Sequence, residues 1–569
     1  MKMTGSQILC ESLLKEDVEV IFGILGGSIL PLYDTLSGYP QLRHVLVRHE
    51  QAAAHAAAGY ARVTGKPGVC FATSGPGATN LVTGIADAFL DSTPIVAVTG
   101  QVATPFIGKD AFQEIDITGI TLPITKHNYQ VNDAAQVAQT VKEAFYVARS
   151  GRPGPILIDI PKDVQVNPAE FDYSMRLVML GYKPTLNGHP SQLKKAAKLI
   201  ADAQRPVIIA GHGVIISEAY AELKDLAEKT QTPVITTLLG ISAIPGSHEL
   251  YYGWLGMHGM AYANKAIDAA DLVIAIGMRF DDRATSKVSG FAPRAKVIHI
   301  DIDPAEIGKN VKVDVPIVGD VKNVLRSMNK FVEPANHEEW LKHLAELKNK
   351  HPLTVPEGGE TILPQFVIRK IYEATKGEAT VVTGVGQHQM WTAQYYTFER
   401  HNTLVTSGGL GTMGFELPAS IGAAVGRPDE AIWCIAGDGS FQMTMQELGT
   451  IVQEKLNIKI AIINNGYLGM VRQWQEMFYE KRYMATPLGC PDFVKLAEAY
   501  CIPALNVTRS SDVEASIQKA MEHPGCFLLN FVVEPEANVY PMVPPGASLA
   551  EVMETPRKEV LTWPPKSTL

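Results

Sequence analysis

Short apolar runs alternate with helix-like stretches along most of the chain, and this pattern restarts twice. The first series begins at Val20 and includes VIFGIL, GVCFATS, PIVAVTG and PILIDIP. A second series contains PVIIAGHGV, LVIAIG and KVIHIDIDP, and a third contains TVVTGVG, AIWCIAGDG and KIAIINN. Apolar strands that alternate with helices are typical of parallel sheets with crossover helices. The sequence therefore predicts an α/β fold with three successive doubly wound parallel-sheet domains.

Two polar stretches divide the chain between these series, one at about 166–190 and a charged, proline-punctuated one at 333–364. Clusters of this composition are typical of linkers. The predicted units are residues 1–165, 190–330 and 365–540, followed by a C-terminal arm or lid over 541–569.

Composition narrows the classes of protein that remain. The formal net charge of −9 argues against a nucleic-acid or anionic-membrane surface. We find no run of 18 apolar residues and expect no membrane span. The N-terminal stretch is predicted to be an amphipathic helix, too acidic for a signal peptide. The six cysteines are scattered without a CxxC pair, which favours a reduced, cytoplasmic location.

One charged residue stands at the end of a predicted buried strand, where IWCIAGDGSF places Asp438 between Gly437 and Gly439. The next strand, KIAIINN, ends in Asn464 and Asn465, and the carboxyl ends of parallel strands meet at one sheet edge. Carboxylate and amide oxygens suit Mg²⁺, and glycines before a helix suit phosphate. An ordinary strand-to-helix turn capped by aspartate is the alternative. The asparagine pair favours a metal-bridged diphosphate.

This spacing resembles the diphosphate-binding signature of thiamine-diphosphate-dependent enzymes, and the three units resemble their pyrimidine-binding, central and diphosphate-binding domains. Finer motifs resemble the catalytic subunits of the acetohydroxyacid (acetolactate) synthase family, among them RHEQAAAHAAAGYAR, SGPGATN, DAFQE, RFDDR, GQHQMW, TSGGLGTMGF and NNGYLGMVRQWQ. The resemblance implies decarboxylation of pyruvate and condensation with a second pyruvate or 2-oxobutyrate, in branched-chain amino-acid biosynthesis. The implied cofactors are thiamine diphosphate, Mg²⁺ and FAD, the last in a structural role.

The resemblance also implies roles for particular residues. Glu50, where a strand gives way to a helix, would activate the pyrimidine ring of the cofactor; a surface charge in a first helical turn is the alternative. Met413 would support the bent cofactor, and Trp474 would shape the acceptor pocket. Arg283 would bind the carboxylate of the second substrate. Gln113 would lie near the site entrance. The metal ligands would be Asp438, Asn465 and Tyr467, and further cofactor contacts would be Gly75, Gly437, Gly439, Met470, Arg152, His258, Arg279, Asp301 and Asp320.

Because Glu50 and Asp438 fall in different units, the resemblance implies a site between two subunits, hence a homodimer or tetramer, with a separate small regulatory subunit. Three other readings stay open: a redox relative such as pyruvate oxidase, glyoxylate carboligase, and a catalytically silent scaffold. Glyoxylate carboligase lacks a glutamate at the position of Glu50. Two residues depart from the family pattern, namely Ala103 in place of proline and Glu416 in place of glycine.

Overall fold

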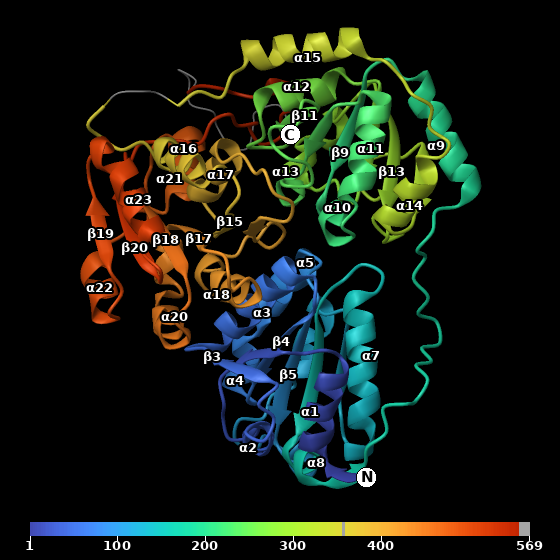
Figure 1. The fold of residues 1–569 in the computed structure, drawn as a ribbon, viewed down its shortest axis with the longest axis vertical. Coiled ribbons are helices and arrows are strands. Elements are labelled where there is room, and N and C mark those ends of the chain that lie inside the picture. Colours follow the sequence, from blue (N-terminus) through green and yellow to red (C-terminus); the bar gives the residue numbers. More distant parts are fainter. Residues whose placement is uncertain (356–358, 557–569) are drawn as a thin grey trace.

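A computed structural model describes residues 1–355 and 359–556 and contains three six-stranded sheets, each built from parallel neighbours (Figure 1). The first sheet has the order β3 (Arg43–Leu46), β2 (Val20–Gly23), β4 (Gly68–Ala72), β5 (Ile95–Gln101), β7 (Ile156–Pro161), β6 (His127–Gln130). The second has β11 (Tyr251–Trp254), β10 (Val234–Thr236), β9 (Pro206–Ala210), β12 (Leu272–Ile276), β13 (Lys296–Asp301), β14 (Val315–Val318). The third has β16 (Leu404–Thr406), β15 (Thr380–Thr383), β17 (Ile432–Gly437), β18 (Ile458–Asn464), β20 (Phe527–Val532), β19 (Ala504–Val507). The predicted class of three parallel-sheet α/β domains is confirmed.

Helices connect and cover these sheets. In the first domain they are α1 (Gly5–Lys15), α2 (Leu30–Leu36), α3 (Glu50–Thr64), α4 (Pro76–Asn80), α5 (Val82–Leu90), α6 (Ile117–Thr121), α7 (Val137–Arg149) and α8 (Lys162–Val166). In the second they are α9 (Pro190–Asp202), α10 (His212–Ile216), α11 (Tyr220–Thr230), α12 (Ala261–Ala269), α13 (Asp282–Thr285), α14 (Val321–Met328) and α15 (Glu338–Lys350). The third has α16 (Pro364–Thr375), α17 (Gln387–Tyr395), α18 (Glu416–Gly426), α19 (Asp438–Gln442), α20 (Leu448–Glu454), α21 (Gly469–Phe478), α22 (Phe493–Ala499) and α23 (Val513–Glu522).

The central strands are apolar almost throughout because helices cover both faces of each sheet. Every residue of β4, β9 and β12 is buried. In the third sheet β17 pairs with β18 so that Gly437 lies beside Ile463. This register brings the polar residues after both strands to one edge of the sheet.

Helices α3 and α18 join the first domain to the third (Figure 1). Both are rich in alanine and glycine, and a Cβ atom at Gly59 would collide with the main-chain carbonyl of Ala419. A Cβ atom at Gly422 would likewise collide with the carbonyl of Ala56. Small residues therefore let the two helix backbones approach closely.

The stretches outside the sheets are more ordered than their composition predicts. The charged stretch 333–364 contains α15, where Trp340 and Leu344 are buried and the Trp340 indole donates to the Pro206 carbonyl at 3.0 Å. The stretch after α8 forms β8 (Pro168–Glu170), which pairs antiparallel with β1 (Lys2–Thr4). The first part of the predicted C-terminal arm contacts the second domain, because Val543 N–H donates to the Met257 carbonyl at 2.7 Å. Residues 557–569 of that arm lie outside the described residues.

Candidate active site

Asp438 lies buried at the carboxyl edge of the third sheet, in the first turn after β17. Its Oδ2 atom accepts a hydrogen bond from Cys490 Sγ at 3.2 Å. Burial raises the pKa of Asp438 above its ordinary value, although the Cys490 hydrogen bond opposes this shift. A carboxylate buried in this way needs a compensating charge, and a bound cation would supply one.

Asn465, directly after β18, is held in place beside this carboxylate edge. Its Oδ1 atom accepts from the Tyr467 N–H at 3.0 Å, and its Nδ2 atom donates to Gln387 Oε1 at 3.1 Å. The described residues contain no cluster of three or more His, Cys, Asp or Glu side chains suited to a metal ion. One carboxylate with amide and main-chain oxygens fits Mg²⁺, which readily takes its remaining ligands from phosphate and water.

The same edge offers a cradle for an anionic group. A Cβ atom at Gly437 would lie 2.7 Å from His388 Nδ1, and one at Gly439 would lie 2.9 Å from Leu468 Cδ2. His388 is buried, and its Nε2 atom has no hydrogen-bond partner within the described part of the chain. Burial lowers the pKa of His388 to about 3, so the ring is neutral there. A neutral ring nitrogen that can donate, beside a glycine-lined helix start, fits a diphosphate.

The residues that the sequence predicts for the site do not include His388. Its motif, GQHQMW, enters only through the family resemblance. Burial and an unsatisfied ring nitrogen, which reveal its suitability, are properties of the folded chain.

Asp438, Asn465 and His388 line a cavity of about 1150 Å³ to which all three domains contribute. Of the predicted site residues, those around the cavity are Arg152, His258, Arg279, Arg283, Asp301, Asp320, Met413, Gly437, Asp438, Gly439, Asn465, Tyr467, Met470 and Trp474. Pockets for one drug-sized ligand usually measure about 300–1,000 Å³. The cavity therefore has room for more than one group.

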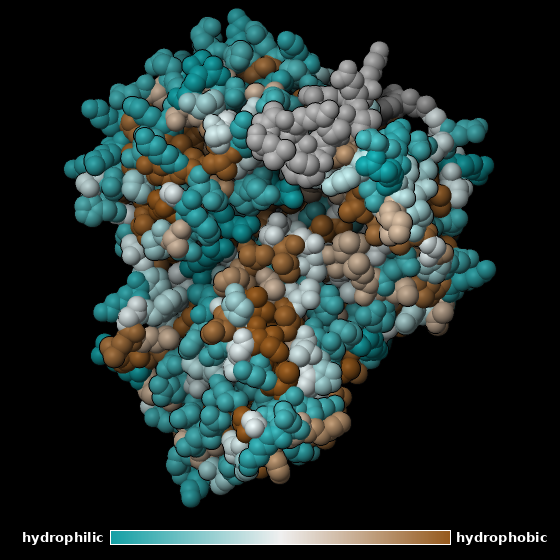
Figure 2. All heavy atoms as spheres, turned by 180° about the vertical axis from the view of Figure 1, so that it is seen from behind, coloured by the Kyte–Doolittle hydropathy of each residue, from teal (hydrophilic) through white to brown (hydrophobic). Residues whose placement is uncertain are grey.

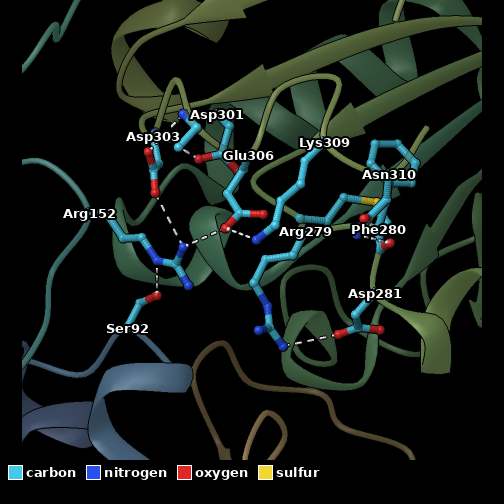
Figure 3. A network of polar contacts seen from close by, with 12 residues as sticks. Ser92, Arg152, Arg279, Phe280, Asp281, Asp301, Asp303, Glu306, Lys309 and Asn310 are labelled. Carbon is cyan, nitrogen blue, oxygen red and sulfur yellow. Dashed lines mark hydrogen bonds and ion pairs between the residues drawn. The ribbon is translucent and has the colours of Figure 1, made fainter. Parts of the chain in front are cut away.

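Acidic and basic side chains gather where the first and second domains meet at the cavity (Figure 3). Arg152 Nε donates to Ser92 Oγ at 2.8 Å, and its Nη1 atom donates to Glu306 Oε1 at 2.9 Å. The Glu306 Oε2 atom is buried without a hydrogen-bond partner in the described residues. Burial raises the pKa of Asp301 to about 7. Buried acceptors of this kind fit the hydroxyl and amino groups of a nucleotide such as FAD.

The glycine-containing turn after β9, in the second domain, is closely packed. A Cβ atom at Gly211 would lie 2.7 Å from Met278 Cβ, and one at Gly213 would lie 2.7 Å from Gly277 Cα. These glycines let the turn after β9 pack directly against the turn after β12. Gly213 and Gly277 both line the cavity, so this packing shapes its wall in the second domain.

Glu50, Gly75 and Gln113 form a second cluster in the first domain. Glu50 begins α3, and its Oε2 atom accepts from Asn80 Nδ2 at 2.9 Å. A Cβ atom at Gly75 would lie 2.8 Å from the Gln113 carbonyl oxygen, and one at Gly77 would lie 3.3 Å from Glu50 Oε1. The described residues that line the large cavity do not include Glu50, Gly75 or Gln113. A single chain thus carries two separate parts of the predicted site.

Several large apolar side chains of the first domain are exposed. Phe112, next to Gln113, is 88% exposed, and Leu122 is 68% exposed. Leu25 and Leu30 are also exposed. Seen from the side opposite to Figure 1, apolar side chains gather in a band over the middle of the surface (Figure 2). Exposed apolar groups in this number are typical of a surface that another protein covers.

Glu416, the unexplained departure from the family pattern, is fully buried at the start of α18. Its Oε2 atom accepts from Ser440 Oγ at 2.9 Å, and Oε1 has no hydrogen-bond partner that the structure describes. Burial raises the pKa of Glu416 to about 7. Ser440 also accepts from the Gly414 N–H at 2.8 Å, so Glu416 supports the turn that follows Met413.

Comparison with known domain families places the chain in a class. Residues 3–120 match "Thiamine pyrophosphate enzyme, N-terminal TPP binding domain", 193–328 the central domain, and 384–531 the C-terminal TPP binding domain of such enzymes. Together with the sheet-edge site, these matches define a thiamine-pyrophosphate enzyme.

Curated relatives narrow this class. An acetolactate synthase of Mycobacterium leprae is 51% identical over 564 residues, which cover 97% of this chain and 90% of the relative. An acetolactate synthase large subunit of Corynebacterium glutamicum is 50% identical over 563 residues, with the same shares covered. A chloroplastic acetolactate synthase of Nicotiana tabacum is 47% identical over 565 residues, covering 96% and 84%. The chain belongs to the acetolactate synthase family, as the sequence motifs predict.

None of the helices in the described part of the chain is both long and apolar enough to cross a membrane.

Proposed function

We propose that the protein is a thiamine-diphosphate-dependent acetolactate synthase. It decarboxylates pyruvate and joins the remaining two-carbon unit to a second pyruvate or to 2-oxobutyrate, and the branched-chain amino-acid pathway uses the products. The observation that carries this proposal is the buried Asp438–Asn465 edge in a cavity shared by three domains, in a chain about half identical to acetolactate synthases.

The residues of the third domain hold the cofactor. Asp438, the side chain of Asn465 and the carbonyl of Tyr467 bind Mg²⁺, while Gly437, Gly439 and His388 hold the diphosphate. Once bound, thiamine diphosphate supplies a carbon nucleophile for the 2-oxo acid and an electron sink for the pair left by carbon dioxide. Met413 and Met470 contact its rings, as their place on the cavity allows.

Glu50 supplies the acid–base function of this site. Asn80 holds its Oε2 atom, which orients the carboxyl group so that Oε1 can bind the pyrimidine ring and exchange a proton with it. This contact requires a second copy of the chain, since Glu50 does not line the cavity of its own chain. The exposed apolar residues of the first domain, Phe112 among them, support a homodimer, or a tetramer of such dimers.

Two residues of the cavity bind the acceptor. The Arg283 guanidinium binds the carboxylate of the second 2-oxo acid, a contact for which its planar fork is suited. Trp474 contacts the acceptor side chain from α21, where its ring packs on Phe478 at a centroid distance of 5.2 Å. In the second domain Arg152, Arg279, Asp301 and Asp320 would hold FAD, and His258, which lines the same cavity, would contact a cofactor.

Other partners follow from the relatives. One relative is named a large subunit, which supports a separate small regulatory subunit here as well. The scattered free cysteines support a reducing, cytoplasmic location.

The test of this function is the Glu50→Gln variant, assayed for acetolactate and for 2-aceto-2-hydroxybutyrate in mixtures of pyruvate and 2-oxobutyrate. Loss of the proton at this position should lower turnover by about 100-fold or more at saturating cofactor. Glu19→Gln, an exposed substitution in the same domain, serves as the control. Full turnover of Glu50→Gln would refute the mechanism, and oxygen uptake equal to pyruvate consumption would favour the oxidase alternative.

A second experiment tests the shared site. Co-expressed Glu50→Gln and Asp438→Asn chains form hybrid dimers in which one site carries both substitutions and the other carries neither. The assay uses a thiamine diphosphate concentration that loads the wild-type site and leaves Asp438→Asn alone inactive. Because half of the dimers would be hybrids, activity should recover to about a quarter of the wild-type value. Two inactive chains that stay inactive together would show that each site belongs to one chain.

A further inference from the structure

Residues 407–413, which we call the Met413 loop, line the cavity with the exception of Thr412, and they are bound to the first domain. The carboxylate of Asp87, in α5, accepts hydrogen bonds at Oδ1 from Thr412 Oγ1 at 2.9 Å and from Ser407 Oγ. Ser407 Oγ in turn accepts the N–H groups of Gly411 at 3.1 Å and Thr412 at 2.9 Å. One carboxylate thus fixes the side chain around which the loop is folded.

Asp91, directly after α5, binds the main chain of the same loop. Its Oδ1 atom accepts from the Gly409 N–H at 2.6 Å, and its Oδ2 atom accepts from the Gly408 N–H at 3.0 Å. Arg62 of α3 forms an ion pair with Asp91 and donates to the Thr406 carbonyl. The loop therefore has side-chain and main-chain attachments to one surface of the first domain.

The side chains of this attachment are buried, and they include two carboxylates but only one guanidinium. Asp87 and Asp91 are 0% and 1% exposed, and the single guanidinium of Arg62 faces both carboxylates. Burial, reinforced by the charge of Asp91, raises the pKa of Asp87 to about 7. The Asp87 Oδ2 atom has no hydrogen-bond partner among residues 1–355 and 359–556. Simple packing would not need this arrangement, because α3 and α18 already join the two domains through small apolar residues. Buried polar groups of this kind instead fix one geometry.

We propose that Asp87 and Asp91 are positioning residues that fix Met413 in the active site from the first domain of the same chain. The role of Met413 rests on the proposed function, whereas attachment of the loop does not. In this arrangement the first domain contributes Glu50 to the active site of a second chain, and it fixes the Met413 loop of its own chain.

The loop attachment can be measured by amide hydrogen exchange on the cofactor-free protein. Asp87→Ala removes the acceptor for Ser407 and Thr412, so exchange of the Gly411 and Thr412 amides should become faster. Asp87→Asn keeps an oxygen in the place of Oδ1 and should restore slow exchange. Peptides from α1, which packs on α2 and α7, should be unchanged in both variants.

The positioning role is measured by calorimetric titration of each protein with thiamine diphosphate in the presence of Mg²⁺. Loss of two hydrogen bonds should weaken binding by about tenfold in Asp87→Ala, and Asp87→Asn should recover it. Asp159→Ala is the matched control, because Asp159 is another fully buried aspartate of the first domain whose pKa burial raises to about 7. It bonds to Thr99 and Gln101 instead, so it should lower stability and leave exchange at residues 407–412 unchanged.

The outcomes separate the two proposals. Unchanged exchange in Asp87→Ala would overturn the attachment, and faster exchange with unaltered cofactor affinity would overturn the positioning role. If the wild-type protein bound no thiamine diphosphate, the proposed function would fail, while the exchange result would still decide the attachment. Should Asp87→Ala not fold, Thr412→Val removes one of the same contacts from the loop side and leaves the Ser407 acceptor in place, and it must also speed exchange of the Gly411 and Thr412 amides.

Discussion

Replacement of Glu416 by glutamine should make the cofactor-free protein more stable at pH 8 and leave its stability at pH 5 nearly unchanged. Glutamine has the shape of glutamic acid, and its amide oxygen can accept the Ser440 hydrogen bond at the place of Oε2. Its NH₂ group takes the place of Oε1, which has no hydrogen-bond partner in the described residues. The substitution therefore removes a titrating group and little else.

The size of the effect follows from the pKa of Glu416, which burial raises from 4.5 to about 7. The folded chain binds this proton more tightly than the unfolded chain, so stability falls as the pH rises from about 4.5 to about 7. Each pKa unit is worth 1.36 kcal/mol, which gives a loss of about 3 kcal/mol above pH 7. The glutamine variant does not titrate and should not lose this free energy.

The assay is scanning calorimetry of both proteins between pH 5 and pH 8, compared as the difference in Tm. About 2.7 kcal/mol of this loss falls above pH 5. A domain of 150–250 residues shifts by about 2–4 °C for each kcal/mol, so the difference should grow by about 5–11 °C across this range. Other buried acids with raised pKa values, such as Asp159 and Asp301, titrate in both proteins and cancel.

Glu430→Gln is the control with the opposite sign. Burial favours the neutral form of Glu430, but hydrogen bonds from Arg400 and Thr380 outweigh it and lower the pKa below 4.5. Its contribution is lost only as the pH falls below that value, so the Tm difference for this variant should be flat from pH 5 to pH 8. Parallel curves for wild type and Glu416→Gln would refute the assignment of a raised pKa to Glu416.

Three further substitutions test the packing and the site. Asp438→Asn removes the buried carboxylate and should weaken Mg²⁺-dependent binding of thiamine diphosphate by about tenfold or more in calorimetry, with binding at wild-type strength as the contrary result. Trp474→Leu should lower the preference for 2-oxobutyrate over pyruvate by about tenfold, measured by product ratio in mixed substrates; an unchanged ratio would place the indole outside the acceptor pocket. Gly59→Ala introduces a Cβ atom that collides with the Ala419 carbonyl and should cost about 1–3 kcal/mol, read as a lower Tm; no change would mean that α3 and α18 can separate without loss.

The sequence predicts that Asp438 and Asn465 lie at one edge of the sheet, because the signal is local. Asp438 and Asn465 belong to consecutive strands joined by one crossover, and such strands must present their carboxyl ends on the same side. The register of β17 and β18 places the two ends side by side as this rule requires. The predicted class of fold rests on the same short-range alternation.

The attachments of the Met413 loop lie beyond this kind of prediction. Asp87 and Ser407 are in different domains, and no pattern of spacing relates them; only the packing of α3 against α18 brings α5 to the loop. For the stretch 333–364 the sequence predicts a linker, whereas the structure contains helix α15. Most residues of this helix are charged or polar, and only two buried positions, Trp340 and Leu344, hold it to the second domain.

Two buried acids hold the Met413 loop, one on each side of Met413. Substitutions of these acids can distinguish the effect of their charge from the effect of their hydrogen bonds. Asp87 binds Ser407 and Thr412 before Met413, while Glu416 acts through Ser440 on the turn after it. Burial raises both pKa values to about 7, so each carboxylate lowers stability once it ionises. An amide in either place keeps the accepting oxygen and removes the charge, so it should stabilise the protein while the loop stays in place. Alanine removes the oxygen as well and should release the loop. Because the two kinds of substitution separate in this way, the structure assigns these acids the role of holding oxygen atoms in position, and their negative charge is a cost of using a carboxyl group to do so.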